Sequence, residues 1–152
     1  MLNIIYYCFA GAHASVVASA IHCGLLPRER VPSRQEFLAV PYYDRTLPEL
    51  VGQPYFMGLD ECGNKVYFMG MWSQRLKIIT ALGEFLDTAG VKQNQYFFQD
   101  AFPLINFSTK LGGLLSKRCH FTEMGRSITV WGIKRRYPCF VELVKKVKQQ
   151  LT

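Results

Sequence analysis

Short, uninterrupted apolar runs alternate along this chain with stretches in which apolar residues recur every three or four positions. The runs have the length and continuity of strands buried on both faces, and they lie at residues 2–8, 54–59, 65–71, 95–99 and 127–133. The helical spacing predicts helices at residues 15–25, from Ser33 onward, at 73–90, at 108–118 and from Pro138 onward. Strands that alternate with helices indicate an α/β fold with a largely parallel, open sheet and helices on both faces.

Turn and cap signals refine this order of elements. The sequence Asp-Glu-Cys-Gly-Asn at 60–64 separates two of the strands and predicts a β-hairpin inserted into the sheet. Ser33 begins a capping-box pattern, Ser73 is a good N-cap, and Pro138 suits the first position of the last helix. We expect a single α/β domain over residues 1–152. The helix that follows Ser73 has an apolar face made of Leu76, Ile79, Leu82, Phe85, Leu86 and Ala89.

Composition narrows the class of protein. Apolar residues make up 49% of the chain, but no apolar run is long enough for a transmembrane helix, so we expect no membrane partner. No Lys or Arg precedes the first run, which argues against a signal peptide. The five cysteines lack paired spacing and fit reduced thiols in a cytoplasmic protein. The His and Cys spacing matches no zinc pattern, and His22 is expected on the solvent side of its helix.

The net charge of +7 comes from the second half of the chain, where residues 77–152 hold twelve basic and five acidic residues. Such a half indicates an anionic partner or simply a solvated surface. Nucleic acid or an acidic protein is one such partner, bound by a non-catalytic basic surface. Aromatic residues are not interleaved with the basic run, so we rank this partner below a phosphate-bearing small molecule. The pattern does not indicate an oligomeric state.

Chemistry-bearing residues gather where the predicted strands end. In an open parallel sheet, ligands bind outside the carboxyl ends of the strands, and a helix N-terminus there favours an anion. Four segments should therefore supply phosphate-binding residues: Gly11, Ala12, His13, Ala14 and Ser15 after the first strand, Ser73 and Arg75 after the hairpin, Asp100 after the next strand, and Lys134, Arg135 and Arg136 after the last.

Three of these edge residues are candidates for catalysis. Cys8 lies beside a helix N-terminus, which favours a thiolate nucleophile, although a buried cysteine at a strand end is an equally common role. His13 could donate to a bound anion, act as an acid or base, or cap the helix locally. Asp100 follows an apolar strand, as a Walker B aspartate does. The pattern indicates no specific cofactor beyond a nucleotide or phosphate.

Three families of anion-binding loop resemble residues 8–15. The Walker A pattern can be laid on the segment that ends at Ser15, but Ala14 replaces its lysine, so ATP hydrolysis by the usual mechanism is not expected. The C-x5-R-S loop of low-molecular-weight tyrosine phosphatases matches Cys8 and Ser15, with Ala14 in place of its arginine clamp. The phosphocysteine loop of cellobiose-type IIB phosphotransferase components is similar at four positions and needs no arginine.

Longer segments point to one family. Together with residues 8–15, the sequences Ala-Ile-His-Cys-Gly-Leu-Leu-Pro at 20–27 and Gly-Leu-Asp-Glu-Cys-Gly-Asn-Lys-Val-Tyr at 58–67 make the chain similar to the bacterial family defined as domain of unknown function 3189. This resemblance covers nearly the whole chain. It implies a small cytoplasmic bacterial protein and assigns no activity or catalytic residue.

The leading hypothesis is therefore a phosphate-bearing ligand or nucleotide bound at the strand-loop-helix of residues 8–15. One alternative is a Cys8-dependent phosphoryl-transfer or phosphatase-like enzyme. Another is a non-catalytic module that binds nucleic acid or an acidic protein through its basic surface.

Overall fold

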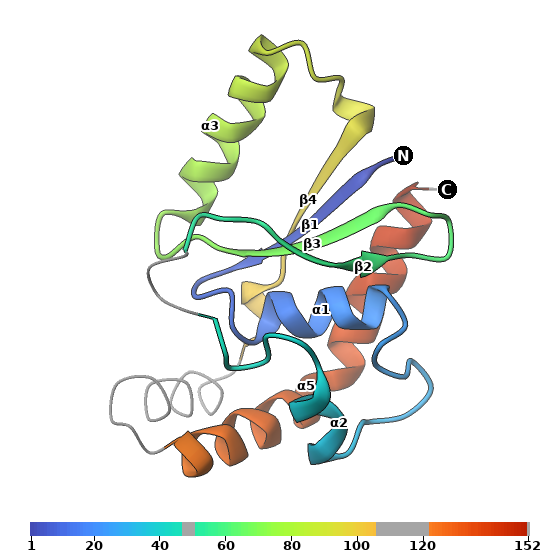
Figure 1. The fold of residues 1–152 in the computed structure, drawn as a ribbon, viewed down its shortest axis with the longest axis vertical. Helices are drawn as coiled ribbons and strands as arrows, with labels where there is room; N and C mark the ends of the chain where they lie inside the picture. The colour runs from blue at the N-terminus through green and yellow to red at the C-terminus, as the bar shows by residue number, and fades with distance from the viewer. Residues whose placement is uncertain (47–50, 106–121, 152) are drawn as a thin grey trace.

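A four-stranded sheet forms the centre of the protein in the computed structural model, which describes residues 1–46, 51–105 and 122–151 (Figure 1). Its strands are β1 (Asn3–Cys8), β2 (Tyr55–Leu59), β3 (Lys65–Gly70) and β4 (Tyr96–Asp100), in the order β2-β3-β1-β4. Strand β1 is parallel to β3 and β4, whereas β2 pairs with β3 in the antiparallel sense. The predicted open and largely parallel sheet with one hairpin is confirmed.

Helices lie on both faces of the sheet, but they cover them unequally. Helices α1 (Ala14–His22) and α5 (Thr122–Leu151) contact each other and form the main core with one face. On the other face, α3 (Arg75–Thr88) covers only a small cluster of buried residues from β1 and the end of β3. Among the described helices, none combines the length and the apolar character needed to cross a membrane.

Strand β1 and helix α1 are the most deeply buried elements. Ile4 and Tyr6 of β1 face the main core, while Ile5 and Tyr7 face the cluster under α3. Because both faces of β1 are covered, its sequence is almost continuously apolar. Every residue of α1 is buried as well.

The predicted helix starts are only partly correct. Ser33 caps α2 (Arg34–Ala39): its hydroxyl accepts the Glu36 N–H at 3.2 Å, and the Glu36 carboxylate accepts the Ser33 N–H at 2.8 Å. Ser73 is not a cap, because α3 begins at Arg75 with Gln74 in the N-cap position. Short 3-10 turns, η2 (Gln93–Gln95) and η3 (Phe102–Leu104), flank β4. The helix predicted at 108–118 lies outside the described residues.

Helix α5 overturns the prediction for the end of the chain. We expected a strand at 127–133 and a helix from Pro138, but one helix runs through both. Proline has no N–H, so one backbone carbonyl group in the preceding turn lacks its helical hydrogen bond. Pro138 is on the exposed side of α5, where water can reach that carbonyl group. Lys134, Arg135 and Arg136 therefore lie within a helix and not after a strand. Buried residues recur at helical spacing across the expected boundary, at Val130, Ile133, Tyr137, Phe140, Val144 and Val147.

Candidate functional site

The loop at residues 8–15 joins β1 to α1 and is built around the sulfur of Cys8. The backbone N–H of Gly11 donates to Cys8 Sγ at 3.3 Å, and Ser15 Oγ lies 3.1 Å from the same sulfur. Ser15 belongs to the first turn of α1, so this contact ties the end of the strand to the start of the helix. The N-cap residue His13 provides no side-chain cap. The first turn of α1 can therefore offer N–H donors to a bound anion.

Two glycines allow this loop to lie directly against the end of β3. Gly11 has a φ of +65°, and a Cβ there would be 2.7 Å from the backbone nitrogen of Gly70. A Cβ at Gly70 would be 2.6 Å from the carbonyl carbon of Ala10. Just beyond β3, Trp72 donates its N–H to the carbonyl oxygen of Phe9 at 2.8 Å. The path of the loop thus depends on backbone contacts that leave no room for a side chain.

Asp44 reaches the loop from the segment that follows α2. Its N–H donates to the carbonyl oxygen of Ala12 at 3.0 Å. Its Oδ1 lies 3.0 Å from Nε2 of His13, and its Oδ2 lies 3.3 Å from Nε of Arg126 in α5. The carboxylate is fully buried, and the backbone φ of +55° is one that Asp tolerates better than most residues. The imidazole of His13 is therefore held by a buried, charge-paired carboxylate.

An aromatic cluster borders the other side of the loop. The rings of Phe9 and Trp72 meet edge to face with centroids 5.0 Å apart, and Phe9 also packs against Phe102 at 6.1 Å. The guanidinium of Arg75 lies 4.3 Å above the Phe102 ring, and its Nε donates to Oδ2 of Asp100 at 2.9 Å. Phe9 and Trp72 keep 37% and 42% of their surfaces exposed. An open aromatic surface therefore lies next to the loop.

Three of the four predicted segments meet at this edge of the sheet. The 8–15 loop, Arg75 and Asp100 are linked through the aromatic cluster, and Ser73 is exposed in the turn before α3. The basic triplet at 134–136 is the exception, because its position after a strand depended on a strand that does not exist. Within α5, Arg135 stacks over Trp131 at 4.8 Å.

The structure adds Asp44 and Arg126, which sequence reasoning missed as site residues. Asp44 contacts His13 across 31 positions of the chain and Arg126 across 82. No local pattern can indicate contacts of this kind. The side-chain chemistry of Asp44 in a loop was the only available signal.

His22 lies at the other end of α1 and is fully buried, contrary to the expectation that it faces solvent. Its Nδ1 is 2.7 Å from the hydroxyl oxygen of Tyr6, and its Nε2 is 3.3 Å from Oδ2 of Asp60 in the hairpin. Burial lowers the pKa of His22 to about 4, even though the contact with Asp60 opposes this shift. The prediction failed because the side of α1 opposite its apolar stripe is also covered.

In the part of the chain that the structure describes, the side chains of metal-ligand type near His22 do not form a metal site. Among the described residues, no group of three or more His, Cys, Asp or Glu side chains could hold a metal ion. Burial raises the pKa of the neighbouring Cys23 to about 12, so this thiol stays protonated at neutral pH.

Comparison with known proteins identifies a protein family that matches most of the chain. No curated protein and no solved structure matches the chain. The family described as Protein of unknown function (DUF3189) matches residues 3–149, a range that includes the 8–15 loop and nearly all of α5. The chain therefore belongs to the DUF3189 family.

Proposed function

We propose that this protein binds a phosphate-bearing ligand at the 8–15 loop. The observation that carries the proposal is the cluster of Gly11 N–H, Cys8 Sγ and Ser15 Oγ at the start of a helix without a side-chain cap. A phosphoryl oxygen here would accept hydrogen bonds from backbone N–H groups in the first turn of α1, and the helix dipole would favour the negative charge of the phosphate. Cys8 and Ser15 are buried, so the ligand would approach past Phe9 and Ala10, which retain exposure.

The charges around the loop are balanced. Arg126 is paired with Asp44, and Arg75 is paired with Asp100. Binding would therefore depend on hydrogen bonds from the loop more than on net positive charge, and its salt dependence would be shallow. A basic surface that binds nucleic acid would instead lose affinity steeply as salt increases. A salt titration of the measured affinity distinguishes the two kinds of binding.

The aromatic surface beside the loop supports a ligand with a planar ring. Phe9 is itself a loop residue, and Trp72 is joined to it by a ring contact and a backbone hydrogen bond. A ring attached to the phosphate could pack against Trp72 while the phosphate occupies the loop. This arrangement favours aryl phosphates and nucleotides over phosphosugars.

Isothermal titration calorimetry with inorganic phosphate, phenyl phosphate, a nucleoside monophosphate and a hexose phosphate tests this function. We expect binding of all four, with the two ring-bearing ligands tighter by about fivefold to tenfold. Trp72→Ala should remove this preference and leave the affinity for inorganic phosphate unchanged. If the wild-type protein binds none of the four at millimolar concentrations, the proposal is wrong.

A matched pair of serine variants tests whether the loop is the site. Ser15→Ala removes a hydroxyl donor and should weaken every ligand by about fivefold to tenfold, the usual effect of one lost hydrogen bond. Ser19→Ala is the control, because Ser19 lies in the same helix but donates to the carbonyl oxygens of Ser15 and Val16. Equal affinities for Ser15→Ala and Ser19→Ala would place the ligand elsewhere.

Phosphoryl transfer by Cys8 is a second candidate function, favoured by the contacts of its sulfur. The N–H of Gly11 points at Sγ, and the Ser15 hydroxyl is close enough to donate to it as well, which suits a thiolate. The thiolate would attack the phosphorus of a phosphate monoester, so that an S–P bond forms while the P–O bond breaks. The departing alcohol would take a proton from an acid, for which His13 is the candidate. Water would then attack the phosphorus and give a proton to His13, so that a P–O bond forms while the S–P bond breaks, which releases inorganic phosphate and restores the thiolate.

Hydrolysis of an aryl phosphate, with mass spectrometry for phosphocysteine, tests this second function. Cys8→Ser should abolish turnover and the trapped intermediate, because the nucleophile is lost. Cys62→Ser is the control, since Cys62 is exposed in the hairpin turn. Hydrolysis that survives in Cys8→Ser would exclude this mechanism and leave the binding proposal standing.

A further inference from the structure

Helix α3 carries apolar side chains that stay largely exposed in the described part of the protein. None of its 14 residues is buried, although Ile79 and Leu82 pack partly against the sheet. Leu76 and Phe85, expected on the apolar face of this helix, keep 60% and 67% of their surfaces exposed. Figure 1 shows α3 extending away from α1 and α5 at one end of the molecule. Exposed apolar surface of this kind marks a contact with another molecule.

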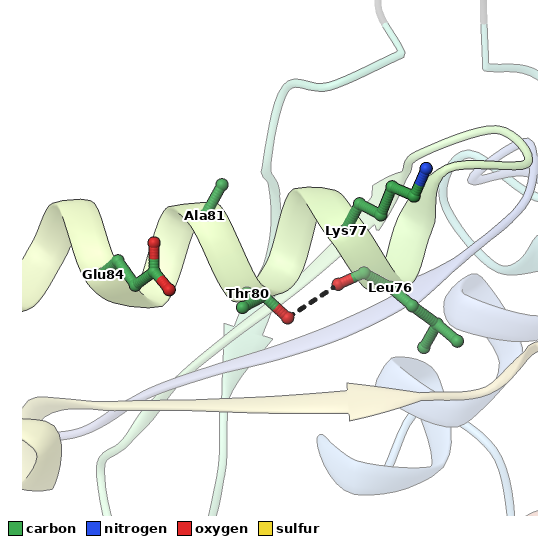
Figure 2. Close-up of a pocket in the computed structure, with 5 residues that line it drawn as sticks. All are labelled: Leu76, Lys77, Thr80, Ala81 and Glu84. Atoms are coloured by element: carbon green, nitrogen blue, oxygen red, sulfur yellow. Dashed lines mark hydrogen bonds between the residues drawn. The ribbon is translucent and has the colours of Figure 1, made fainter.

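On the outer face of α3, two small residues lie between a basic and an acidic residue. Leu76, Lys77, Thr80, Ala81 and Glu84 line a shallow hollow along it. Figure 2 shows Lys77 and Ala81 on one flank of the helix and Leu76 and Thr80 on the other. The small residues Thr80 and Ala81 lie between a basic residue towards the N-terminal end and an acidic residue towards the C-terminal end. A second helix can approach most closely where the side chains are small.

We propose that this face pairs with the same face of a second copy of the chain. A two-fold axis between Thr80 and Ala81 would run the two helices antiparallel and set each residue opposite the one equally far from the axis. Lys77 would then face Glu84 of the second copy, and symmetry would repeat this ion pair at the other end. A parallel pairing would bring Lys77 against Lys77. The face is therefore complementary to itself in only one direction.

The side chains at the two ends of the face agree with this pairing. Lys77 and Glu84 make no salt bridge with another residue in the described part of the chain, so both are available. At each end of the paired faces, Leu76 of one copy would lie on one side of the ion pair. Phe85 of the second copy would lie on the opposite side of the same ion pair. The two apolar side chains would thus enclose each ion pair, and their exposed surface would leave water. A second copy of the chain would therefore provide contacts for all four side chains: Leu76, Lys77, Glu84 and Phe85.

Sedimentation equilibrium and charge-reversal variants test the proposal. The wild-type chain should form dimers with a micromolar dissociation constant, in keeping with a small interface. Glu84→Lys and Lys77→Glu should each weaken the dimer by about tenfold or more, because two attractions become two repulsions. An equimolar mixture of the two variants should associate again, since each Glu then faces a Lys. The double variant should also dimerise. Lys145→Glu, an exposed reversal on α5, is the control and should behave as the wild type does.

The mixture makes the test decisive, because misfolding of one variant cannot produce association on mixing. A wild-type chain that stays monomeric at millimolar concentration would overturn the proposal. A dimer that withstands Glu84→Lys would also overturn it, because its interface would lie elsewhere. Neither result bears on the phosphate site, which uses none of these residues.

Discussion

The buried imidazole of His22 predicts how the stability of the protein depends on pH. Nδ1 can accept the Tyr6 hydroxyl proton and Nε2–H can donate to Asp60, so the neutral ring satisfies both contacts. Burial is the largest cause of its low pKa, and Lys148 lowers it further. A second proton would place a charge on a ring that is closed to solvent. Acidification should therefore favour the unfolded chain.

The size and sign of the effect follow from the two pKa values of His22. In the unfolded chain the imidazole takes up its proton near pH 6.5, and in the folded protein only near pH 4. Between these values the unfolded chain binds more protons, so the free energy of unfolding falls as the pH falls. At about 1.4 kcal/mol for each pH unit, the interval from 6.5 to about 4 gives a loss of roughly 3 kcal/mol. Above pH 6.5 the contribution is complete.

The neighbouring carboxylate acts in a lower pH range. Burial by itself would raise the pKa of Asp60, but hydrogen bonds from Asn64 and Cys62 outweigh it and hold the pKa below its ordinary value of 3.8. The stability that Asp60 contributes is therefore lost only as the pH falls below this value. Hydrogen bonds from Arg30 and Lys148 lower the pKa values of Glu36 and Glu61, so these two groups also begin to reduce stability as the pH approaches 4. The difference in slope between the wild type and a His22 variant therefore reports His22, and the wild-type slope alone does not.

Urea unfolding followed by circular dichroism across this interval measures the effect. His22→Gln keeps a donor and an acceptor but does not titrate, so its stability should fall less steeply, by up to about 1.4 kcal/mol for each pH unit. Ile21→Val is the matched control, because it removes one buried methylene group from the same helix and no titrating group. Equal slopes for wild type and His22→Gln would refute the reasoning. So would an NMR titration of the folded protein with a His22 midpoint near pH 6.5.

Three further predictions concern stability measured by the same unfolding assay. Gly70→Ala should lower the free energy of unfolding by roughly 1–3 kcal/mol, because its Cβ would meet backbone atoms of Ala10. Gly83→Ala is the matched control: it has open space around it and should raise the free energy of unfolding by about 0.5–1 kcal/mol. Asp44→Asn should cost about 3 kcal/mol, because it removes the buried charge that faces Arg126, and a loss below about 0.5 kcal/mol would contradict this. Ser33→Ala should cost about 1 kcal/mol through the lost α2 cap and should leave phosphate binding unchanged.

The parts of the fold that could be predicted are those with local signals. The run of β1 is apolar because both faces of the strand are covered, and the glycine at position 11 marks a turn with positive φ. In the hairpin, the Asp60 carboxylate accepts the N–H groups of Cys62 and Asn64, which closes the turn within five residues. Each of these features depends on neighbours in the sequence, so the pattern contains the necessary information.

The start of α5 could not be predicted from its own residues. The sequence Ile-Thr-Val-Trp at 128–131 is typical of a strand when taken alone. Its helical state depends on Val130, Ile133 and Tyr137, which continue the buried stripe of the following turns into the core around α1. Pro138 suggested a boundary because sequence alone does not show that it faces solvent. This one error is the reason that the sequence analysis assigned the basic triplet to the candidate site.

The anchoring of the 8–15 loop supports a binding role more strongly than its sequence does. A strand and a helix can be joined by local contacts alone, yet this loop is held by Gly70, Trp72 and Asp44, which come from two other parts of the chain. Such anchors order the loop during folding, so a ligand would not have to supply that free energy. The same anchors bury Cys8 and leave Phe9 as the exposed part of the loop. A ligand must therefore pass Phe9 to reach the sulfur, and we expect the Phe9–Trp72 pair to control access to the site.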